Sequence, residues 1–284
     1  MPAQLVALGA RTIDVTSRAL VMAICNRTPD SFFDQGSYFS FDGFLARVDA
    51  AVSEGADLLD VGGVKAGPGP EVSLGEELER VVPAVAAIRE RFDVPVSVDT
   101  WRADVASAAF EAGAVLGNDI SGFADPRYLE VAAAAGASVV ATHIRLAPRV
   151  PDPEPVYGDV VVEVRDRLAV LARSAVDAGV SPAGVIVDAG LDLGKTPEQS
   201  LELLRASQRL AVLGHPLLLS ASNKRFLGDV LGLDVDSRRE ASLAAVALGI
   251  AGGCRLLRVH DVAGTVRVRD VLAAILEEQG DDAC

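Results

Sequence analysis

The sequence predicts an α/β protein, a single (β/α)8 TIM barrel with a short cap at its N-terminus. Three observations favour this fold: eight short apolar runs typical of buried strands, a helical run after each of them, and no linker between the units. A closed barrel needs eight strand–helix units in about 250 residues. A doubly wound open sheet is the alternative, but such sheets usually have fewer units and a glycine-rich first turn.

The elements are expected in a regular order along the chain. Residues 1–20 predict a strand pair or cap. The expected strands are continuous apolar runs, as in sheets buried on both faces, at Val21–Cys25, Leu58–Val61, Val96–Val98, Val115–Asn118, Ser138–Thr142, Val185–Asp188, Leu217–Ser220 and Leu256–Val259. The expected helices lie between and after them, at Phe41–Glu54, Leu74–Phe92, Arg102–Ala112, Pro126–Ala135, Asp159–Ala178, Pro197–Leu210, Ser237–Ala251 and Val266–Gln279. Residues 1–284 are therefore expected to form one domain.

Composition excludes several functional classes. The 284 residues are 50% hydrophobic, enough for a large core, but no run of about 18 apolar residues predicts a membrane span. A net charge of −14 argues against general binding of nucleic acid or anionic membranes. The N-terminus has no signal-peptide pattern, and three scattered cysteines suit a reducing compartment, so we expect a cytoplasmic protein.

Familiar catalytic motifs are missing from the sequence. The three histidines form no H-E-x-x-H pair or Cys–His cluster, so no zinc site is expected. No G-x-S-x-G elbow is present. The segment Gly190–Thr196 resembles a phosphate loop but is one residue short of that motif, because Ala189 stands where its first glycine would have to be.

Polar residues instead follow the expected strands. The first apolar run ends at Asn26, and Pro29 and Gly36 keep the polar loop after it from becoming helical. Later strands end at Asp99-Thr100, Asn118-Asp119, Asp188, Ser222-Asn223-Lys224 and Arg258-Val-His260-Asp261. Any one of these could simply cap a helix or shape a loop. Together they predict a site, because all carboxyl ends of a barrel's strands face one mouth.

The chemistry of these residues indicates two kinds of ligand group. Carboxylate and amide groups can bind the donor face of a guanidine-like heterocycle, while Lys224 accompanies its carbonyl oxygen. Arg258, His260 and Asn26 could hold a diphosphate, with or without Mg²⁺.

Several ordered motifs resemble those of the dihydropteroate synthase family of pterin-binding barrels, over about residues 18–278. They are Asn26-Arg-Thr-Pro-Asp-Ser-Phe, Ser97-Val-Asp99-Thr, Asn118-Asp-Ile-Ser, Asp188-Ala-Gly190 with Gly194-Lys195, Ser222-Asn-Lys224 and Arg258-Val-His260-Asp-Val. The last motif separates synthases from the methyl-transferring pterin barrels, which share the aspartates but not the diphosphate site.

The resemblance implies a reaction and a set of site residues. In that family an aminobenzoate amine displaces diphosphate from a hydroxymethyl-dihydropterin, and catalysis is mostly positioning and leaving-group stabilisation. It implies that the first loop covers the site, that the protein is a homodimer and that Mg²⁺ binds at Asn26 with the diphosphate. The residues it implies are Asp99, Asn118, Asp188 and Lys224 for the pterin, Asn26, Arg258 and His260 for the diphosphate, and Ser222, Leu193 and Pro68 near the second substrate.

The second substrate loop departs from the family pattern G-G-E-S-T-R-P-G. Its glycines and proline remain, but Val64, Lys65, Ala66 and Gly67 replace Glu, Ser, Thr and Arg. Charged hydrogen bonds contribute about 1.5–3 kcal/mol each, so losing an organising pair lowers a rate by about 10²–10⁴. Lysine does not replace arginine's bidentate geometry. Other departures are Arg27 for valine, Gln35 for glycine, Ala189 for proline, Leu193 for an aromatic and Asn223 for arginine.

The sequence therefore favours a divergent homologue with little or no synthase activity, which is not the main folate enzyme and which could still bind pterins or sulfonamide-type ligands weakly. One alternative is a functional synthase that tolerates the unusual loop. A further alternative is a non-catalytic module that binds a pterin or diphosphate in a regulatory or partner-binding role.

Overall fold

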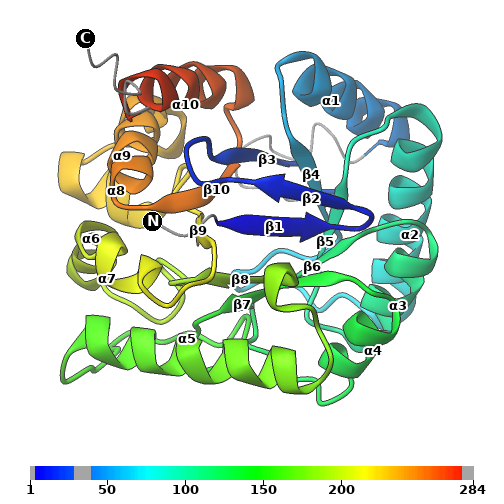
Figure 1. Cartoon of the computed structure of the whole chain (residues 1–284), viewed down its shortest axis with the longest axis horizontal. Coiled ribbons are helices and arrows are strands. Elements are labelled where there is room, and N and C mark those ends of the chain that lie inside the picture. The colour runs from blue at the N-terminus through cyan, green and yellow to red at the C-terminus, as the bar shows by residue number, and fades with distance from the viewer. Residues whose placement is uncertain (1–3, 29–39, 277–284) are drawn as a thin grey trace, which may run out of the picture.

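The barrel strands are continuous apolar segments, which is why they lie buried between a core and a ring of helices. The computed structural model describes residues 4–28 and 40–276 (Figure 1). Among these residues, eight parallel strands close into a barrel in the order β10-β3-β4-β5-β6-β7-β8-β9. They are β3 (Leu20–Ile24), β4 (Leu58–Gly62), β5 (Val96–Asp99), β6 (Leu116–Asp119), β7 (Ser138–Thr142), β8 (Val185–Asp188), β9 (Leu217–Leu219) and β10 (Cys254–Val259). The predicted (β/α)8 fold is confirmed.

A hairpin closes the amino-terminal end of the barrel. β1 (Leu5–Leu8) and β2 (Arg11–Asp14) pair antiparallel and lie across the barrel in Figure 1. Val6 and Leu8 pack with Leu20, Met22 and other inward-facing strand residues in one buried cluster. The Ser138 hydroxyl at the start of β7 donates to the Ala7 carbonyl at 2.6 Å. The expected N-terminal cap therefore completes the lower core of the barrel.

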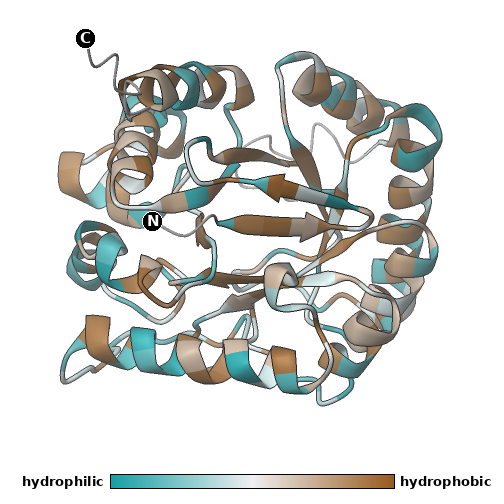
Figure 2. Cartoon of the chain, viewed as in Figure 1, coloured by the Kyte–Doolittle hydropathy of each residue, from teal (hydrophilic) through white to brown (hydrophobic). Residues whose placement is uncertain are grey.

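Amphipathic helices surround the strands and bury one side of each helix against them. Figure 2 shows mostly hydrophobic strands, while the surrounding helices carry hydrophilic and hydrophobic residues on different sides. Within the described ranges, no helix is both long and apolar enough to cross a membrane. The helices are α1 (Phe41–Ser53), α2 (Leu74–Arg91), α3 (Ala103–Glu111), α4 (Tyr128–Ala134), α5 (Val160–Asp177), α6 (Pro197–Arg205), α7 (Ser207–Ala211), α8 (Arg225–Leu231), α9 (Arg239–Ala251) and α10 (Val262–Leu276).

The helices differ from the sequence prediction at three places. The single helix expected over 197–210 is divided into α6 and α7, and at the division the Ser207 hydroxyl donates to the Leu204 carbonyl at 2.7 Å. The short helix α8 was not predicted; it ends at Gly232, which has a φ of 64°. Helix α10 begins four residues early because Asp261 accepts the backbone N–H of Gly264 at 2.8 Å. Its predicted end at Gln279 lies outside the described residues.

Candidate functional site

Three of the predicted polar residues lie at the carboxyl ends of strands in the same part of the barrel, which runs from β5 to β8. Asp99 ends β5 and is paired in register with Asn118 of β6, while Asp188 ends β8 and is paired with Thr142 of β7. All four residues are buried. Thr100 follows Asp99 in the sequence, but its side chain turns away from the barrel mouth, and its hydroxyl donates to the Glu77 carboxylate of α2 at 2.6 Å. The mouth of the barrel thus has a buried polar floor.

The guanidinium of Arg258 joins two carboxylates of this floor. Its Nε donates to Asp60 Oδ2 at 2.6 Å, and its NH2 donates to Asp99 Oδ2, also at 2.6 Å. Asp60 accepts two further hydrogen bonds, from the Ser97 hydroxyl at 2.6 Å and from the Asn118 amide at 3.1 Å. Two residues predicted to bind different parts of a ligand, Asp99 and Arg258, are therefore paired with each other.

Asp60 is a site residue that the sequence prediction missed. It lies inside a strand rather than at its end, and it is fully buried. The available signal was its charge: Asp60 is the one charged residue in the apolar run of Leu58–Gly62. A charged side chain in a buried strand needs a partner, and Arg258 supplies it.

The charges of this cluster influence protonation. Burial raises the pKa of Asp99 to about 7, the carboxylate of Asp60 adds to the rise, and the Arg258 guanidinium opposes it. The two carboxylates hold the pKa of Arg258 above its ordinary value despite its burial. Arg258 therefore stays charged, and Asp99 exchanges a proton near neutral pH.

Asp188 and Lys224 support the loop that follows β8. Asp188 accepts the backbone N–H of Gly190 at 2.8 Å, and the Lys224 ammonium donates to the Leu191 carbonyl at 2.7 Å. Burial raises the pKa of Asp188, and the nearby Lys224 charge opposes this rise. Burial lowers the pKa of Lys224, and Asp188 opposes that change. The two charges thus stabilise each other in a buried setting.

Asn26 points a buried amide oxygen at the floor. Its Oδ1 has no hydrogen-bond partner among the described residues. A Cβ atom at Gly62 would lie 2.7 Å from this oxygen and 3.3 Å from the Asp99 Cβ, so the close approach requires glycine there. The amide oxygen is therefore a buried acceptor whose hydrogen-bonding capacity the described residues leave unused. The remainder of the first loop, residues 29–39 with Pro29, Gln35 and Gly36, lies outside the described residues, and so does the expectation that it covers the site.

His260 packs next to Ser222, with the guanidinium groups of Arg258 and Arg47 nearby. Its Nδ1 lies 3.0 Å from the Ser222 hydroxyl. Burial and the charges of Arg258 and Arg47 lower the pKa of His260 to about 3, so its imidazole is neutral at physiological pH. Arg47 of α1, which donates to the His260 carbonyl at 2.6 Å, is a second residue that the sequence prediction missed. It lies on a helix, outside the pattern of polar strand ends.

A cavity of about 570 Å³ lies beside the floor. Pro68 and Leu193, two of the residues predicted near a second substrate, both line it, whereas Ser222 is not part of its wall. Its apolar lining comes mainly from the loops after β4, β7 and β8, and Arg149 and Arg225 supply positive charge. Within the described chain, no group of three or more His, Cys, Asp or Glu residues could hold a metal ion.

Two of the altered positions, Val64 in the second loop and Arg27 in the first, are turned into the protein. Val64 is buried. The Arg27 guanidinium lies 5.1 Å from the centroid of the Phe41 ring and donates to the Arg80 carbonyl at 2.9 Å. Two replaced positions of the family pattern thus contribute packing, and neither contributes a charge to the floor.

Comparisons with known proteins agree with this geometry. The profile of a family described as "Pterin binding enzyme" matches residues 22–260. A Mycobacterium leprae protein named "Inactive dihydropteroate synthase 2" is 47% identical over 264 residues, covering 91% of each chain. The dihydropteroate synthase of Bacillus subtilis is 39% identical over 265 residues, covering 93% of this chain and 90% of its own.

A solved structure has the same fold. The Yersinia pestis dihydropteroate synthase, crystallised with a sulfonamide drug complex, superimposes with a TM-score of 0.91 at 35% sequence identity. The match covers 95% of this chain and 98% of that one.

Proposed function

The chain belongs to the family of pterin-binding enzymes, and from this premise we propose a dihydropteroate synthase homologue with little or no synthase activity, which is not the main folate enzyme of its cell. One observation carries the proposal. The floor residues remain, whereas Val64, Lys65, Ala66 and Gly67 replace the family's Glu-Ser-Thr-Arg. Binding of the first ligand is then retained while organisation of the second is lost. The relative from Mycobacterium leprae, whose name includes "inactive", supports this proposal.

The first ligand is proposed to be a pterin. Asp99, Asn118, Asp188 and Lys224 combine acceptors and a donor that suit its guanidine-like edge and its carbonyl oxygen. The pairing of Arg258 with Asp99 means that a pterin must compete with a guanidinium already present, because both groups donate to the same carboxylate. This competition weakens binding unless Arg258 finds a new partner on the ligand, and a diphosphate is such a partner.

A diphosphate with Mg²⁺ is proposed to bind at Asn26, Arg258 and His260. Mg²⁺ prefers oxygen ligands and often binds through few protein groups together with substrate phosphates. The unpartnered Oδ1 of Asn26 fits that requirement. Mg²⁺ would neutralise charge on the diphosphate; Arg258 would orient it, and the neutral His260 would donate or accept one hydrogen bond.

The second ligand is proposed to be an aminobenzoate-like or sulfonamide-type molecule bound weakly near Pro68, Leu193 and Ser222. The apolar cavity wall suits an aromatic ring, and a rim arginine such as Arg225 suits its acidic group. We further propose that residues 1–284 form one domain, that the protein is a cytoplasmic homodimer, and that neither nucleic acid nor membrane is a partner.

Two other functions remain as alternatives. A functional synthase, condensing hydroxymethyl-dihydropterin diphosphate with 4-aminobenzoate, is favoured by the complete floor. A non-catalytic module that binds a pterin or diphosphate is favoured by the self-paired Arg258. Turnover close to that of an authentic synthase distinguishes the first alternative from our proposal. A low but measurable turnover distinguishes our proposal from the second alternative, which expects stabilisation by a ligand and no turnover at all.

The first experiment measures formation of dihydropteroate by the purified protein with both substrates and Mg²⁺. An authentic synthase is assayed under identical conditions. We expect a rate at least about 100-fold lower than that of the control, the lower estimate for two lost charged hydrogen bonds. A rate within about tenfold of the control would show that the second loop tolerates these replacements and would refute the proposal.

The second experiment tests the floor by ligand-dependent thermal stabilisation. Asp99→Ala and Lys224→Ala are each expected to abolish the increase in melting temperature that a pterin diphosphate gives the unchanged protein. The reason is that each substitution removes a charged partner of the ligand. Arg165→Met, on the exposed face of α5, is the control and should keep the full increase. If the pterin diphosphate raised the melting temperature of both floor variants as much as that of the unchanged protein, the assignment of Asp99 and Lys224 to pterin binding would be refuted.

A further inference from the structure

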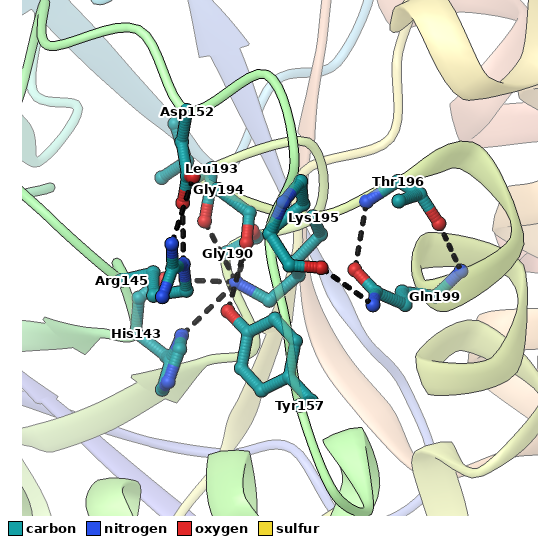
Figure 3. A network of polar contacts seen from close by, with 11 residues as sticks. His143, Arg145, Asp152, Tyr157, Gly190, Leu193, Gly194, Lys195, Thr196 and Gln199 are labelled. Carbon is teal, nitrogen blue, oxygen red and sulfur yellow. Dashed lines mark hydrogen bonds and ion pairs between the residues drawn. The ribbon is translucent and has the colours of Figure 1, made fainter.

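Lys195 lies at the centre of a polar network beside the cavity (Figure 3). Its ammonium donates to the carbonyl oxygens of Gly190 at 2.9 Å, Leu193 at 3.0 Å and His143 at 3.3 Å. It also contacts His143 Nδ1 at 3.0 Å. The side chain is buried, so these four groups replace water around the charge. Such a cluster of acceptors suits an ammonium ion, which has only donors.

The acceptors come from two different loops. His143 begins the loop after β7, and Gly190 and Leu193 belong to the loop after β8. The second loop needs glycine at two places, because Gly190 and Gly194 have φ values of 63° and 64°. A Cβ at Gly190 would lie 1.9 Å from the His143 carbonyl oxygen. The two loops are therefore in contact along their backbones, with Lys195 bonded to both.

Further contacts extend the same network to the edge of the cavity. The Tyr157 hydroxyl donates to the Gly194 carbonyl at 2.8 Å, and its ring lies 6.1 Å from that of His143. Arg145 and Asp152 form a bidentate ion pair across the loop after β7. Both Asp152 and Gly194 line the cavity, as does Lys195 itself. The shape of the wall thus depends on the network.

The loop after β8 also reaches the floor. The Leu191 carbonyl accepts the ammonium of Lys224, while the carbonyls on either side of it in sequence, those of Gly190 and Leu193, accept the ammonium of Lys195. The backbone N–H of Gly190 donates to Asp188. A displacement of this loop would consequently move partners of both proposed pterin-binding charges.

We propose that Lys195 is a positioning residue whose ammonium group joins the loops after β7 and β8 and thereby shapes the second-ligand cavity and orients Lys224. The binding part of this inference rests on the proposed function, whereas the joining of the loops does not. Lys195 touches neither ligand in this role, and its effect on binding passes through Leu193 and Leu191.

The role of the charge makes the cavity sensitive to pH. Burial lowers the pKa of Lys195 to about 7, with Asp188 and Asp192 opposing this change and Lys224 adding to it. Burial and the Lys195 charge lower the pKa of His143 to about 3, so the imidazole stays neutral and accepts. Charged or titratable groups from several elements surround the Lys195 ammonium. They are His143, Arg145, Asp152, Tyr157, Arg167, Asp188, Asp192 and Lys224. A neutral amine has one donor fewer, so one contact is lost above neutral pH.

Hydrogen exchange of the unliganded protein tests the joining of the loops. In Lys195→Met, amides of residues 143–158 and 189–197 are expected to exchange roughly 10- to 100-fold faster, the factor for losing a hydrogen bond to a charged group. Amides of the barrel strands should be unchanged. Lys195→Arg keeps the charge and should restore part of the protection, and Arg165→Met on α5 is the control. Uniform acceleration throughout the barrel, or none in either loop, would overturn the proposal.

The pH dependence gives a second test that needs no variant to fold. The sequence has only three lysines, Lys65, Lys195 and Lys224, so their side-chain signals can be resolved after selective ¹³C labelling. The Lys195 signal is expected to titrate near pH 7, together with the loss of loop protection beyond the intrinsic pH effect. A Lys195 signal that remains constant from pH 6 to pH 9 would mean that the amine stays charged, and loop protection beyond the intrinsic effect should then also stay constant. Loop protection that changes independently of the Lys195 signal would overturn the proposal.

Calorimetry with 4-aminobenzoate and with a pterin separates this inference from the proposed function. We expect affinity for 4-aminobenzoate to fall about tenfold or more in Lys195→Met and to fall with rising pH in the unchanged protein. If the unchanged protein binds neither probe, the proposed function fails, and hydrogen exchange alone decides the role of Lys195. If both bind equally in the variant, the positioning role fails.

Discussion

Arg258 shows how a single side chain can supply hydrogen-bond partners to the buried carboxylates of a site when no ligand is bound. One guanidinium faces two carboxylates, Asp60 and Asp99, across the barrel. The cluster keeps a net negative charge, and Asp99 responds with a pKa raised to about 7. In the absence of a ligand, the floor therefore satisfies its own hydrogen bonds at the expense of affinity for a cationic or donor-rich ligand.

The consequence for stability is a pH-dependent loss in Arg258→Met. Removing one partner of a buried ion pair costs about 3–5 kcal/mol. For Asp99 the folded-state pKa lies above the unfolded value of 3.8, so its contribution to stability is complete below that value and is lost as the pH rises through about 7. We expect the full loss at pH 8 and a smaller one at pH 5, where Asp99 holds a proton.

Urea unfolding at both pH values measures this difference. Arg165→Met, which removes an exposed guanidinium paired with Asp166, should lose less than about 0.5 kcal/mol at either pH. An equal loss at pH 5 and pH 8 for the Arg258 variant would contradict the assigned protonation of Asp99.

The sequence could predict residues at strand ends but not those paired across the barrel. Asp99, Asn118 and Asp188 were expected at the mouth and lie there, although their role in binding a pterin stays a prediction. Asp60 was missed because its partner Arg258 is 198 residues away, a pairing that no local pattern encodes. The mutual contact of Arg258 and Asp99 was missed for the same reason.

At the scale of elements, the loop after β8 depends on glycine. Gly190→Ala introduces a Cβ both at a positive φ and against the His143 carbonyl, whereas Gly136→Ala introduces one at the same φ of 63° with no atom within 4 Å. The positive φ destabilises both alanine variants by about 1 kcal/mol. The steric clash adds about 1–3 kcal/mol in Gly190→Ala alone.

Chemical denaturation gives the free energy of unfolding of both variants. The difference between the two values measures the steric clash with the His143 carbonyl, because the cost of the positive φ is the same in both. Gly190→Ala should also lose protection of the Lys195-bonded loops, because the His143 and Gly190 carbonyls can no longer both reach the ammonium. Equal stability of the two variants would mean that the loop relaxes without cost and that the contact between the loops is not tight.

The elements themselves were largely predictable. All eight strands were expected within two residues of their observed bounds, because fully buried parallel strands have continuous apolar sequences. The split between α6 and α7 and the short helix α8 were not, since their causes are a single serine hydrogen bond and a seven-residue segment without strong periodicity. Short helices depend more on tertiary packing than on local propensity.

At the scale of the whole molecule, the proposed homodimer is expected to form through the surface of the last three helices. Most apolar side chains of α9 face the core, but Leu248 of α9, Leu231 of α8 and Val271 and Ile275 of α10 are exposed. The three helices are neighbours in Figure 1. Apolar side chains gathered on adjacent helices suit an isologous interface in which each copy covers the other.

Sedimentation at micromolar concentration is expected to show a dimer. A double substitution, Leu248→Glu and Ile275→Glu, should raise the dissociation constant at least about 100-fold, because two charges would be buried on each side of the interface. Val170→Glu, at an exposed apolar position of α5, is the matched control and should leave the dimer intact. A monomer in the unchanged protein would exclude the homodimer.

The N-terminal hairpin covers one end of the barrel and packs on its inward-facing strand residues. The floor and the cavity both lie at the other end, where the strands end in loops. A ligand on the floor and a ligand in the cavity would therefore both enter from the end of the barrel where the strands end, opposite the hairpin.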